Sequence, residues 1–570
     1  MGKNKFKDYD QGDFYSAYLY SYMPKNKYLE NVDKLIDFAI FNKISDHLYS
    51  NIGQKAFLPS MQVKIIFLQT NYSLSDRQLE ERLNFDLSWK RFVGLPAGFF
   101  GYDHSTLGLF RDRIGVEGYK AIHNYILAQI VDRGLIDAGE PWLKDATHSL
   151  SRLANHSAIQ LAQQAIGQLE FLLRRICPAG HLEFTKQFNI AELLKEKPVY
   201  REGKGSKCAR LQLVVTTGYA VLNWVEHKAA KGKLDLSDDK WQQVEEKARV
   251  LGDILEQNFT LDDSSSGGPG DKSTSNTPES EITTAAKASQ AKGTHVKITR
   301  YREKTKDEKP GDRIVSAVDE DARRGAKSAK KFFLGPKSEI TLTGKSHLIL
   351  NAKAIAGNEP DGGHIFEMVD EVKEIHGLEP PKIIGDGKYG SMDTRIEGKE
   401  RGIQVVAPLA DPINPTGGYT ADKFKYDPLL SIVICPAGRL TSMNHRNEAA
   451  GATIYHFSAT FCSNCPQKKY CTRSDRGRTI TIEDTWAVAD DARRYLGTPE
   501  AGQDMRIRSQ LERVNNELKN NLGLKVSRFY GLAKHQVQLH ATSFVYNIRQ
   551  TMRLIMRENT KKGTAINATL

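Results

Sequence analysis

The sequence contains no run of about 18 apolar residues, so no segment is long enough to form a helix that spans a membrane. Its first residues, MGKNKFKDYDQGDFYSAYLY, lack the apolar stretch of a secretory signal peptide. Cysteine is scarce, with six in 570 residues, which excludes a scaffold built on disulfides. These absences predict a cytoplasmic protein with no membrane partner.

Acidic residues are fewer than basic ones, and the formal net charge is +12. A basic surplus favours an anionic partner, of which nucleic acid is the commonest, although a mild surplus alone is weak evidence. The chain is also too long for a single hydrophobic core, so we expect several domains.

Composition and hydrophobic periodicity divide the chain into segments of different character. Residues 262–312 include almost no large apolar side chain and are expected to form a flexible linker. After it, two strands, a helix, a strand, a helix and a strand predict an α/β core. The expected segments are a helical N-terminal domain (1–135), the first core strand (136–150), a helical insertion (151–261), the linker (262–312), the α/β core (313–430), a four-cysteine module (431–495), C-terminal core helices (496–558) and a disordered tail (559–570).

The expected insertion carries two series of apolar residues at alternating three- and four-residue steps. Such a seam forms either the core of one bundle or a contact between molecules, and we favour packing within the insertion. The two series are Ile159, Ala162, Ile166, Leu169, Leu173 and Ile176, and then Trp241, Val244, Ala248, Leu251 and Leu255.

A predicted core strand in the stretch PPKIIGDGKYGS, residues 380–391, ends on Asp386. The simplest interpretation is an ordinary aspartate that caps the next helix. The other is a metal ligand at the carboxyl edge of an α/β sheet, where such folds place their sites. The stretch PWLKDATHS, residues 141–149, predicts a second short strand that ends on Asp145.

A third acid lies in MRIRSQLERVNNELKNNLGLKVSRFYG, residues 505–531, which is strongly helical up to Gly523. At about 100° per residue, Arg508, Glu512 and Lys519 share one helix face, which is also typical of a solvated charge ladder. Three carboxylates in one cleft repel one another and require cations. Their hard oxygen atoms select Mg²⁺ or Mn²⁺, and two such ions promote phosphodiester chemistry.

Four of the six cysteines cluster as Cys435, Cys462, Cys465 and Cys471. The CSNC spacing lets two thiolates face one ion from a tight turn, which predicts a structural Zn²⁺ in a small zinc-ribbon-like module. Four buried cysteines without a metal are the alternative. His445 and His456 are competing ligands, but neither has the paired spacing.

The sequence resembles bacterial insertion-sequence transposases of the DDE class. The resemblance rests on YSLSDRQLEERLNFDLSWKRFVGL, DHSTLGLFRDRI, the DATH and GDGKYGS stretches, and the cysteine module ICPAG…CSNCPQKKYC. The family signature Y-x2-R-x3-E-x6-K falls on Arg508, Glu512 and Lys519, with Met505 at the tyrosine position.

The resemblance implies an α/β ribonuclease H-like core in which Asp145, Asp386 and Glu512 hold Mg²⁺ and catalyse. It implies cutting of terminal inverted repeats and joining of the 3′ ends to target DNA, by a homodimer assembled on double-stranded DNA. A DNA-binding protein that no longer cuts, or a metal-dependent nuclease that never joins strands, stays open. The expected DNA-binding residues are Arg508, Lys519, Lys90, Arg91, Arg111 and Arg113.

Overall fold

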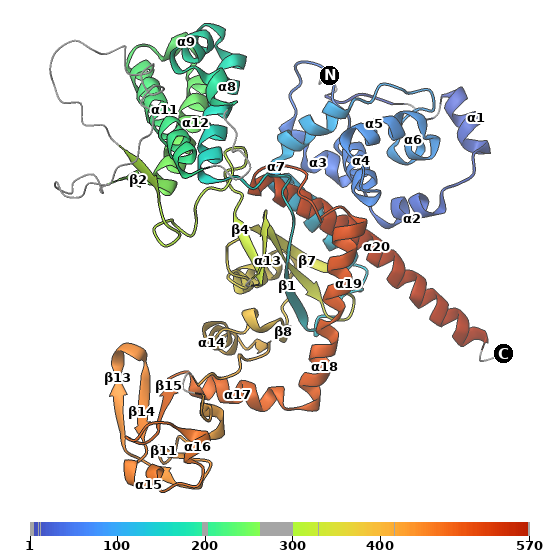
Figure 1. Ribbon diagram of the computed structural model, residues 1–570. Coiled ribbons are helices and arrows are strands. Elements are labelled where there is room, and N and C mark those ends of the chain that lie inside the picture. The colour runs from blue at the N-terminus through green and yellow to red at the C-terminus, as the bar shows by residue number, and fades with distance from the viewer. Residues whose placement is uncertain are drawn as a thin grey trace, which may run out of the picture.

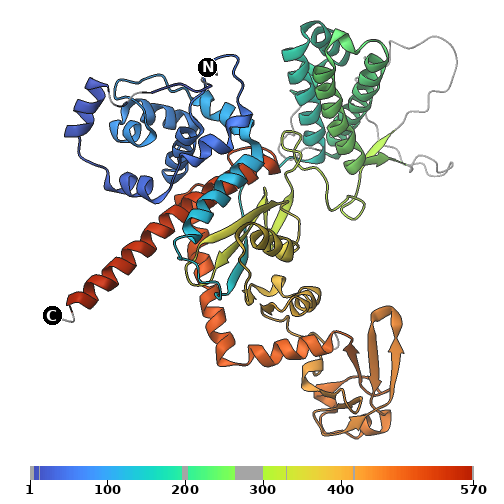
Figure 2. The same cartoon turned by 180° about the vertical axis from the view of Figure 1, so that it is seen from behind.

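The computed structural model places helical domains around a central mixed sheet (Figures 1 and 2). In the part of the chain that it describes, no helix combines the length and the apolar character needed to cross a membrane. The described residues are 5–9, 11, 13–195, 203–262, 300–328, 330–414 and 417–567, with side chains up to residue 560.

The N-terminal region is helical, as its periodicity predicts. Ser75 and Gln78 form a reciprocal capping box at the start of α5, so the sequence fixes that helix end locally. Gly115 leaves the helical conformation (φ 58°, ψ −163°) and breaks α7 into two parts. The helices are α1 (Phe14–Tyr22), α2 (Lys27–Leu35), α3 (Ile40–Ile44), η1 (Asp46–Leu48), α4 (Pro59–Asn71), α5 (Asp76–Phe85), α6 (Leu87–Val93) and α7 (His104–Val131).

The central sheet has five strands in the order β7-β6-β1-β8-β9. The β7, β6 and β1 strands pair antiparallel, whereas β1, β8 and β9 pair parallel. The inner strands β1 and β6 are largely buried, although both carry several polar side chains. The strands are β1 (Trp142–His148), β6 (Lys337–Thr343), β7 (Ile349–Ile355), β8 (Lys382–Ile384) and β9 (Gln404–Val406).

Helices cover both faces of this sheet. On one face, α13 (Ile365–His376) packs its apolar side chains against Trp142, Leu350 and Ile383. The long helix α20 (Leu532–Asn567) crosses the other face and also packs on α4 and α7 (Figure 1). One core therefore joins the N-terminal helices to the sheet. Between β8 and β9 lie η4 (Gly387–Tyr389) and α14 (Met392–Glu400).

The insertion after β1 is a separate helical bundle with its own core. Its two predicted apolar seams lie on α8 and α12, which pack on each other, so packing within the insertion is confirmed as their role. The elements are α8 (Ala158–Ile176), α9 (Pro178–Phe188), α10 (Ile190–Leu193), α11 (Lys204–Ala230), η2 (Lys233–Asp235) and α12 (Asp238–Asn258), followed by β2 (Phe259–Leu261) and β3 (Tyr301–Glu303).

A hairpin and a small β-rich module complete the chain before its last helices. The hairpin consists of β4 (Arg324–Ser328) and β5 (Lys331–Leu334). The module contains two three-stranded sheets. Its elements are η5 (Ala421–Lys423), β10 (Lys425–Asp427), β11 (Ile432–Ile434), β12 (Leu440–Thr441), β13 (Asn444–Asn447), η6 (Glu448–Ala450), β14 (Ala452–His456), α15 (Ala459–Ser463), α16 (Lys468–Cys471) and β15 (Thr479–Glu483).

The C-terminal helical region returns from the module to the sheet (Figure 1). The expected continuous helix up to Gly523 is broken at Ser509 and widens into a π-turn before its end. Its elements are α17 (Trp486–Leu496), α18 (Pro499–Arg508), α19 (Gln510–Asn516) and the π-turn η7 (Glu517–Asn521).

The structure corrects two expected boundaries. Most of the predicted linker, 263–299, lies outside the described residues, but at its end β3 pairs antiparallel with β2, and Tyr301 stacks on Tyr219 of the bundle. The predicted disordered tail, 559–570, is helical as far as Asn567, since no proline interrupts α20 there.

Candidate active site

The two strand aspartates meet through the register of the sheet. Trp142 pairs with Ile383 and Leu143 with Ile384 in the parallel ladder of β1 and β8. Continuing that register by two residues brings Asp145 beside Asp386, just past the carboxyl end of β8. The strand β1 does not end on Asp145 as expected; it runs on to His148 because its other edge stays paired with β6.

Asp386 has the local role that its sequence suggests. Its Oδ1 accepts a hydrogen bond from the backbone N–H of Lys388 at 2.9 Å and caps the short η4 helix. Gly385 is required here, because a Cβ atom on it would lie 2.6 Å from the Cβ of Tyr389, which folds back beneath the turn. Capping uses one carboxylate oxygen and is compatible with metal binding by the other.

Asp145 faces helix α19, and the residue that it meets there is Asn515. The Nδ2 of Asn515 donates a hydrogen bond of 2.6 Å to Oδ2 of Asp145. The pKa of Asp145 is raised to about 6, chiefly because burial penalises its charged form. The nearby charge of Asp386 also raises this pKa, while Asn515 and Arg508 lower it.

Glu512, the third predicted acid, is exposed on α19, one turn before Asn515. The structure does not bring it into a compact ligand set with Asp145 and Asp386. Among the described residues, the one group of three or more candidate ligands whose atoms lie within 4.8 Å of one another is Glu80, Asp103 and His104. The assignment of Glu512 stays a prediction.

Basic side chains surround the aspartate pair. Arg508 lowers the pKa of Asp145 through its charge, and Asp145 in turn raises that of Lys519, whose pKa burial lowers overall. Lys388 forms an ion pair of 2.7 Å with Asp361, and this contact, together with Asp386 and Asp145, raises its pKa. Anionic oxygens at this site would meet positive charge on several sides.

Two family models match the chain. A transposase domain, DUF772, matches residues 17–113, and a transposase DDE domain matches residues 434–552. The chain therefore carries two transposase domains, and the second is of the DDE type. No curated protein and no solved structure matches it.

The DDE domain implies a ribonuclease H-like core, and the central mixed sheet is the α/β part of the transposase in which the aspartates meet. The matched range includes α17 to α19, with Glu512, and all four clustered cysteines. Asp145 and Asp386 lie outside it, so their assignment rests on the geometry of the sheet.

The four clustered cysteines of the transposase line one small cavity of about 30 Å³. Burial raises the pKa of the Cys471 thiol, and the three other cysteines add to this effect. The backbone N–H of Arg439 lies 3.3 Å from Sγ of Cys435. The thiols share a lining, yet among the described residues no three of them meet within 4.8 Å of one another.

Two of the expected DNA-binding residues of the transposase are turned inward. Lys90 is 1% exposed, and its Nζ donates to the carbonyl oxygen of Ala97 at 3.0 Å. Arg111 forms an ion pair of 2.9 Å with Asp76, and its side chain is 13% exposed. Both side chains have partners within the protein, because a basic residue in an amphipathic helix also serves to pack and to pair, and their contact with DNA stays a prediction.

The other two expected DNA-binding residues of the N-terminal region, Arg91 and Arg113, remain at least partly exposed to solvent. Arg91 donates to the carbonyl oxygen of Tyr20 at 3.0 Å, and its side chain is 32% exposed. Arg113 is exposed, with its guanidinium 4.4 Å from the ring centroid of Tyr49.

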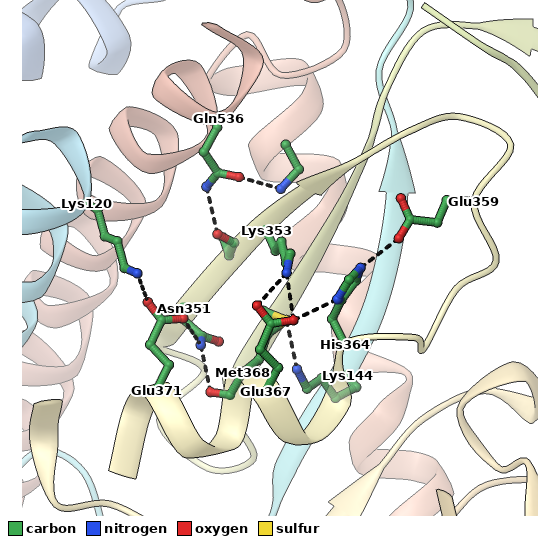
Figure 3. A network of polar contacts seen from close by, with 12 residues as sticks. Lys120, Lys144, Asn351, Lys353, Glu359, His364, Glu367, Met368, Glu371 and Gln536 are labelled. Carbon is green, nitrogen blue, oxygen red and sulfur yellow. Dashed lines mark hydrogen bonds and ion pairs between the residues drawn. The ribbon is translucent and has the colours of Figure 1, made fainter. Parts of the chain in front are cut away.

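Sequence reasoning missed Asn515 and Lys144. Asn515 is seven residues after Arg508, so helical periodicity places the two within about 20° on one face, a signal that was available. Lys144 is buried on the opposite face of β1 from Asp145, with its Nζ 3.1 Å from Sδ of Met368 on α13 (Figure 3). Because side chains alternate along a strand, the sequence predicts that Lys144 and Asp145 lie on opposite faces. It does not predict that the lysine is buried.

Proposed function

We propose that this transposase cuts the terminal inverted repeats of an insertion sequence and joins the freed 3′ ends to target DNA. The observation that carries the proposal is the β1–β8 register, which sets Asp145 beside Asp386 at the carboxyl edge of the sheet. The likeness to the DDE domain adds Glu512 as the third carboxylate.

The residues present suit a divalent cation. Asp145 and Asp386 repel each other, and burial opposes the charged form of Asp145, so a cation would relieve both penalties. The Oδ1 atom of Asn515 is buried with no hydrogen-bond partner among the described residues. Asp145, Asp386 and Glu512 would hold Mg²⁺ or Mn²⁺, which supply activation of the attacking oxygen and stabilisation of the leaving oxygen.

The remaining groups position the carboxylates and the DNA. Asn515 holds Oδ2 of Asp145 and so fixes how its carboxylate is turned. Arg508 and Lys519 lie near Asp145 and would bind phosphates on each side of the scissile bond. The partly exposed Arg91 and the exposed Arg113 would contact the DNA ends, and two copies of the chain would act together on the paired ends.

Separate assays of cleavage and of strand joining test this function. Duplexes carrying the element's end sequence, found by sequencing the DNA that flanks the gene, should be cut and joined with Mg²⁺ or Mn²⁺ and left intact in EDTA. Cleavage without joining would favour a nuclease. Binding without cleavage in either metal would favour a protein that has lost its chemistry.

We also propose that Cys435, Cys462, Cys465 and Cys471 bind one structural zinc ion. Four thiols that line one small cavity are a suitable donor set. To bind one ion, the cysteine side chains would have to rotate so that their sulfur atoms come closer together. Elemental analysis should find about one zinc per chain, which survives dialysis against Mg²⁺. Loss of that zinc in Cys465→Ser, but not in Cys208→Ser, would support the site; purified protein without zinc would contradict it.

A further inference from the structure

The β4–β5 hairpin carries a concentration of positive charge. Between residues 323 and 337 the sequence has six Lys and Arg residues and no acid. Arg323 is ion-paired with Asp312, and Lys337 with Asp361. The other four are exposed and form no ion pair with the described residues. They are Arg324, Lys327, Lys330 and Lys331.

Two neighbouring phenylalanines of β5 have opposite orientations. Phe333 packs on His148 at the end of β1, with ring centroids 4.7 Å apart. It also fills the space above Gly325, where a Cβ atom would lie 2.2 Å from its ring. Phe332 points outward and is 53% exposed, with the Arg324 guanidinium 4.5 Å from its ring centroid. Phe333 therefore anchors the hairpin and Phe332 offers a free aromatic face.

The hairpin is fixed beside the aspartate pair. The backbone N–H groups of Ser149 and Ser151, just after β1, donate to the carbonyl oxygens of Pro336 and Leu334. Burial lowers the pKa of both His148 and Lys519, and the nearby charge of Lys327 lowers both further. The charge of Asp145 also acts on Lys519, by raising its pKa. The basic face of the hairpin therefore adjoins the candidate active site. Figure 1 shows β4 between the helical insertion and the central sheet.

An unpaired DNA strand fits this surface. Exposed lysines without counterions suit phosphates, and an aromatic ring among them suits a base whose face is free. A base inside a duplex has no free face, whereas a frayed or cut strand offers one. We propose that the β4–β5 hairpin holds an unpaired stretch of the DNA substrate beside the aspartates, with Phe332 stacked on a base and the lysines at phosphates. This inference rests on the proposed function for its substrate.

The test uses full-length protein in EDTA, so that binding is measured without cleavage. The probes are a blunt end duplex and the same duplex with four unpaired bases, one of them the fluorescent base 2-aminopurine. Phe332→Ala should weaken binding of the frayed probe by about 5- to 150-fold, abolish the change in 2-aminopurine emission and leave blunt-duplex binding unchanged. Phe332→Tyr should restore both signals.

Phe171→Ala is the matched control, because Phe171 is also exposed (44%) beside an arginine, Arg174, but lies on the insertion. It should behave as the wild type. The triple variant Lys327→Ala, Lys330→Ala, Lys331→Ala should reduce the slope of log affinity against log salt by about 2. Unchanged 2-aminopurine emission in Phe332→Ala, or equal losses on blunt and frayed probes, would overturn the inference. Wild-type protein that binds the frayed probe in this way but never cuts DNA would refute the proposed function alone.

Discussion

Strand β1 has two unlike faces, although Lys144 and Asp145 are adjacent in the chain. Burial shifts the pKa of each toward the neutral form: that of Asp145 is raised to about 6, and that of Lys144 is lowered to about 7. Asp145 has one side-chain hydrogen bond, from Asn515, and a like charge nearby. Lys144 is enclosed by α13, and the charges of Glu339, Glu371 and Glu367 favour its protonated form.

The two faces differ in which charges offset the cost of burying Lys144 and Asp145. On the Lys144 face, ion pairs such as Lys120–Glu371 (2.7 Å) and Lys353–Glu367 (2.6 Å) join the sheet and α7 to α13 (Figure 3). On the Asp145 face, the excess negative charge is available to an external cation. On the Lys144 face, neighbouring carboxylates offset part of the cost of burial, whereas on the Asp145 face a bound cation would do so.

The largest expected effect is on the Asp145 face. Asp386→Ala should slow Mg²⁺-dependent cleavage of end DNA at least about 1000-fold, because it removes a carboxylate from the metal-binding pair. Asp145→Ala and Glu512→Ala should do the same, while DNA binding in EDTA stays near the wild-type value. Gel assays of product formation measure the rate.

Asp393→Ala is the control for these variants, since Asp393 is exposed on α14. It should cut normally. Substantial cleavage by Asp386→Ala would remove Asp386 from the site, and substantial cleavage by Glu512→Ala would mean that another group serves as third ligand.

Features set by local rules or by strand pairing were predictable from the sequence. Residues that precede turns and lie between glycines, such as Asp386, identify a sheet edge, and the apolar seams of the insertion identify its core. Side chains whose partners are distant in sequence were not predictable. Arg111 is turned inward by Asp76 on another helix, and Asn515 reaches Asp145 from 370 residues away.

A smaller effect is expected on the Lys144 face. Lys144→Met keeps the side-chain length and removes an amine whose pKa is lowered by burial from its ordinary value of 10.5 to about 7 in the folded protein. The unfolded chain gains from protonating this amine at pH 7 to 8, so the substitution should raise the free energy of unfolding by about 1–3 kcal/mol. Adding Glu339→Gln should increase this gain, because Glu339 then no longer stays buried without the positive charge of Lys144. Urea unfolding of the two single variants and the double variant measures the coupling.

Lys353→Met is the matched control, because its ion pair with Glu367 is partly exposed, and it should cost less than about 1 kcal/mol. Additive changes in the free energy of unfolding for Lys144→Met and Glu339→Gln would show that the two charges do not interact.

The smallest expected effect is a stabilisation that depends on pH. The pKa of Asp145 is higher in the folded protein, at about 6, than its ordinary value of 3.8, so the folded state binds more protons between these values. Stability therefore falls as pH rises through that window, and the full cost remains above pH 6. Asp145→Asn avoids this cost, and in EDTA it should raise the free energy of unfolding by about 1–2 kcal/mol at pH 7 to 8. The gain should shrink strongly toward pH 4, where Asp145 is protonated in the folded protein and partly so in the unfolded one. Asp393→Asn should show no such trend.

Saturating Mg²⁺ should make the wild type more stable than Asp145→Asn at pH 8, because the ion stabilises only the chain that keeps the Asp145 carboxylate. A gain in Asp145→Asn that is equal at pH 4 and pH 8 would mean that the charge of Asp145 is already compensated within the protein.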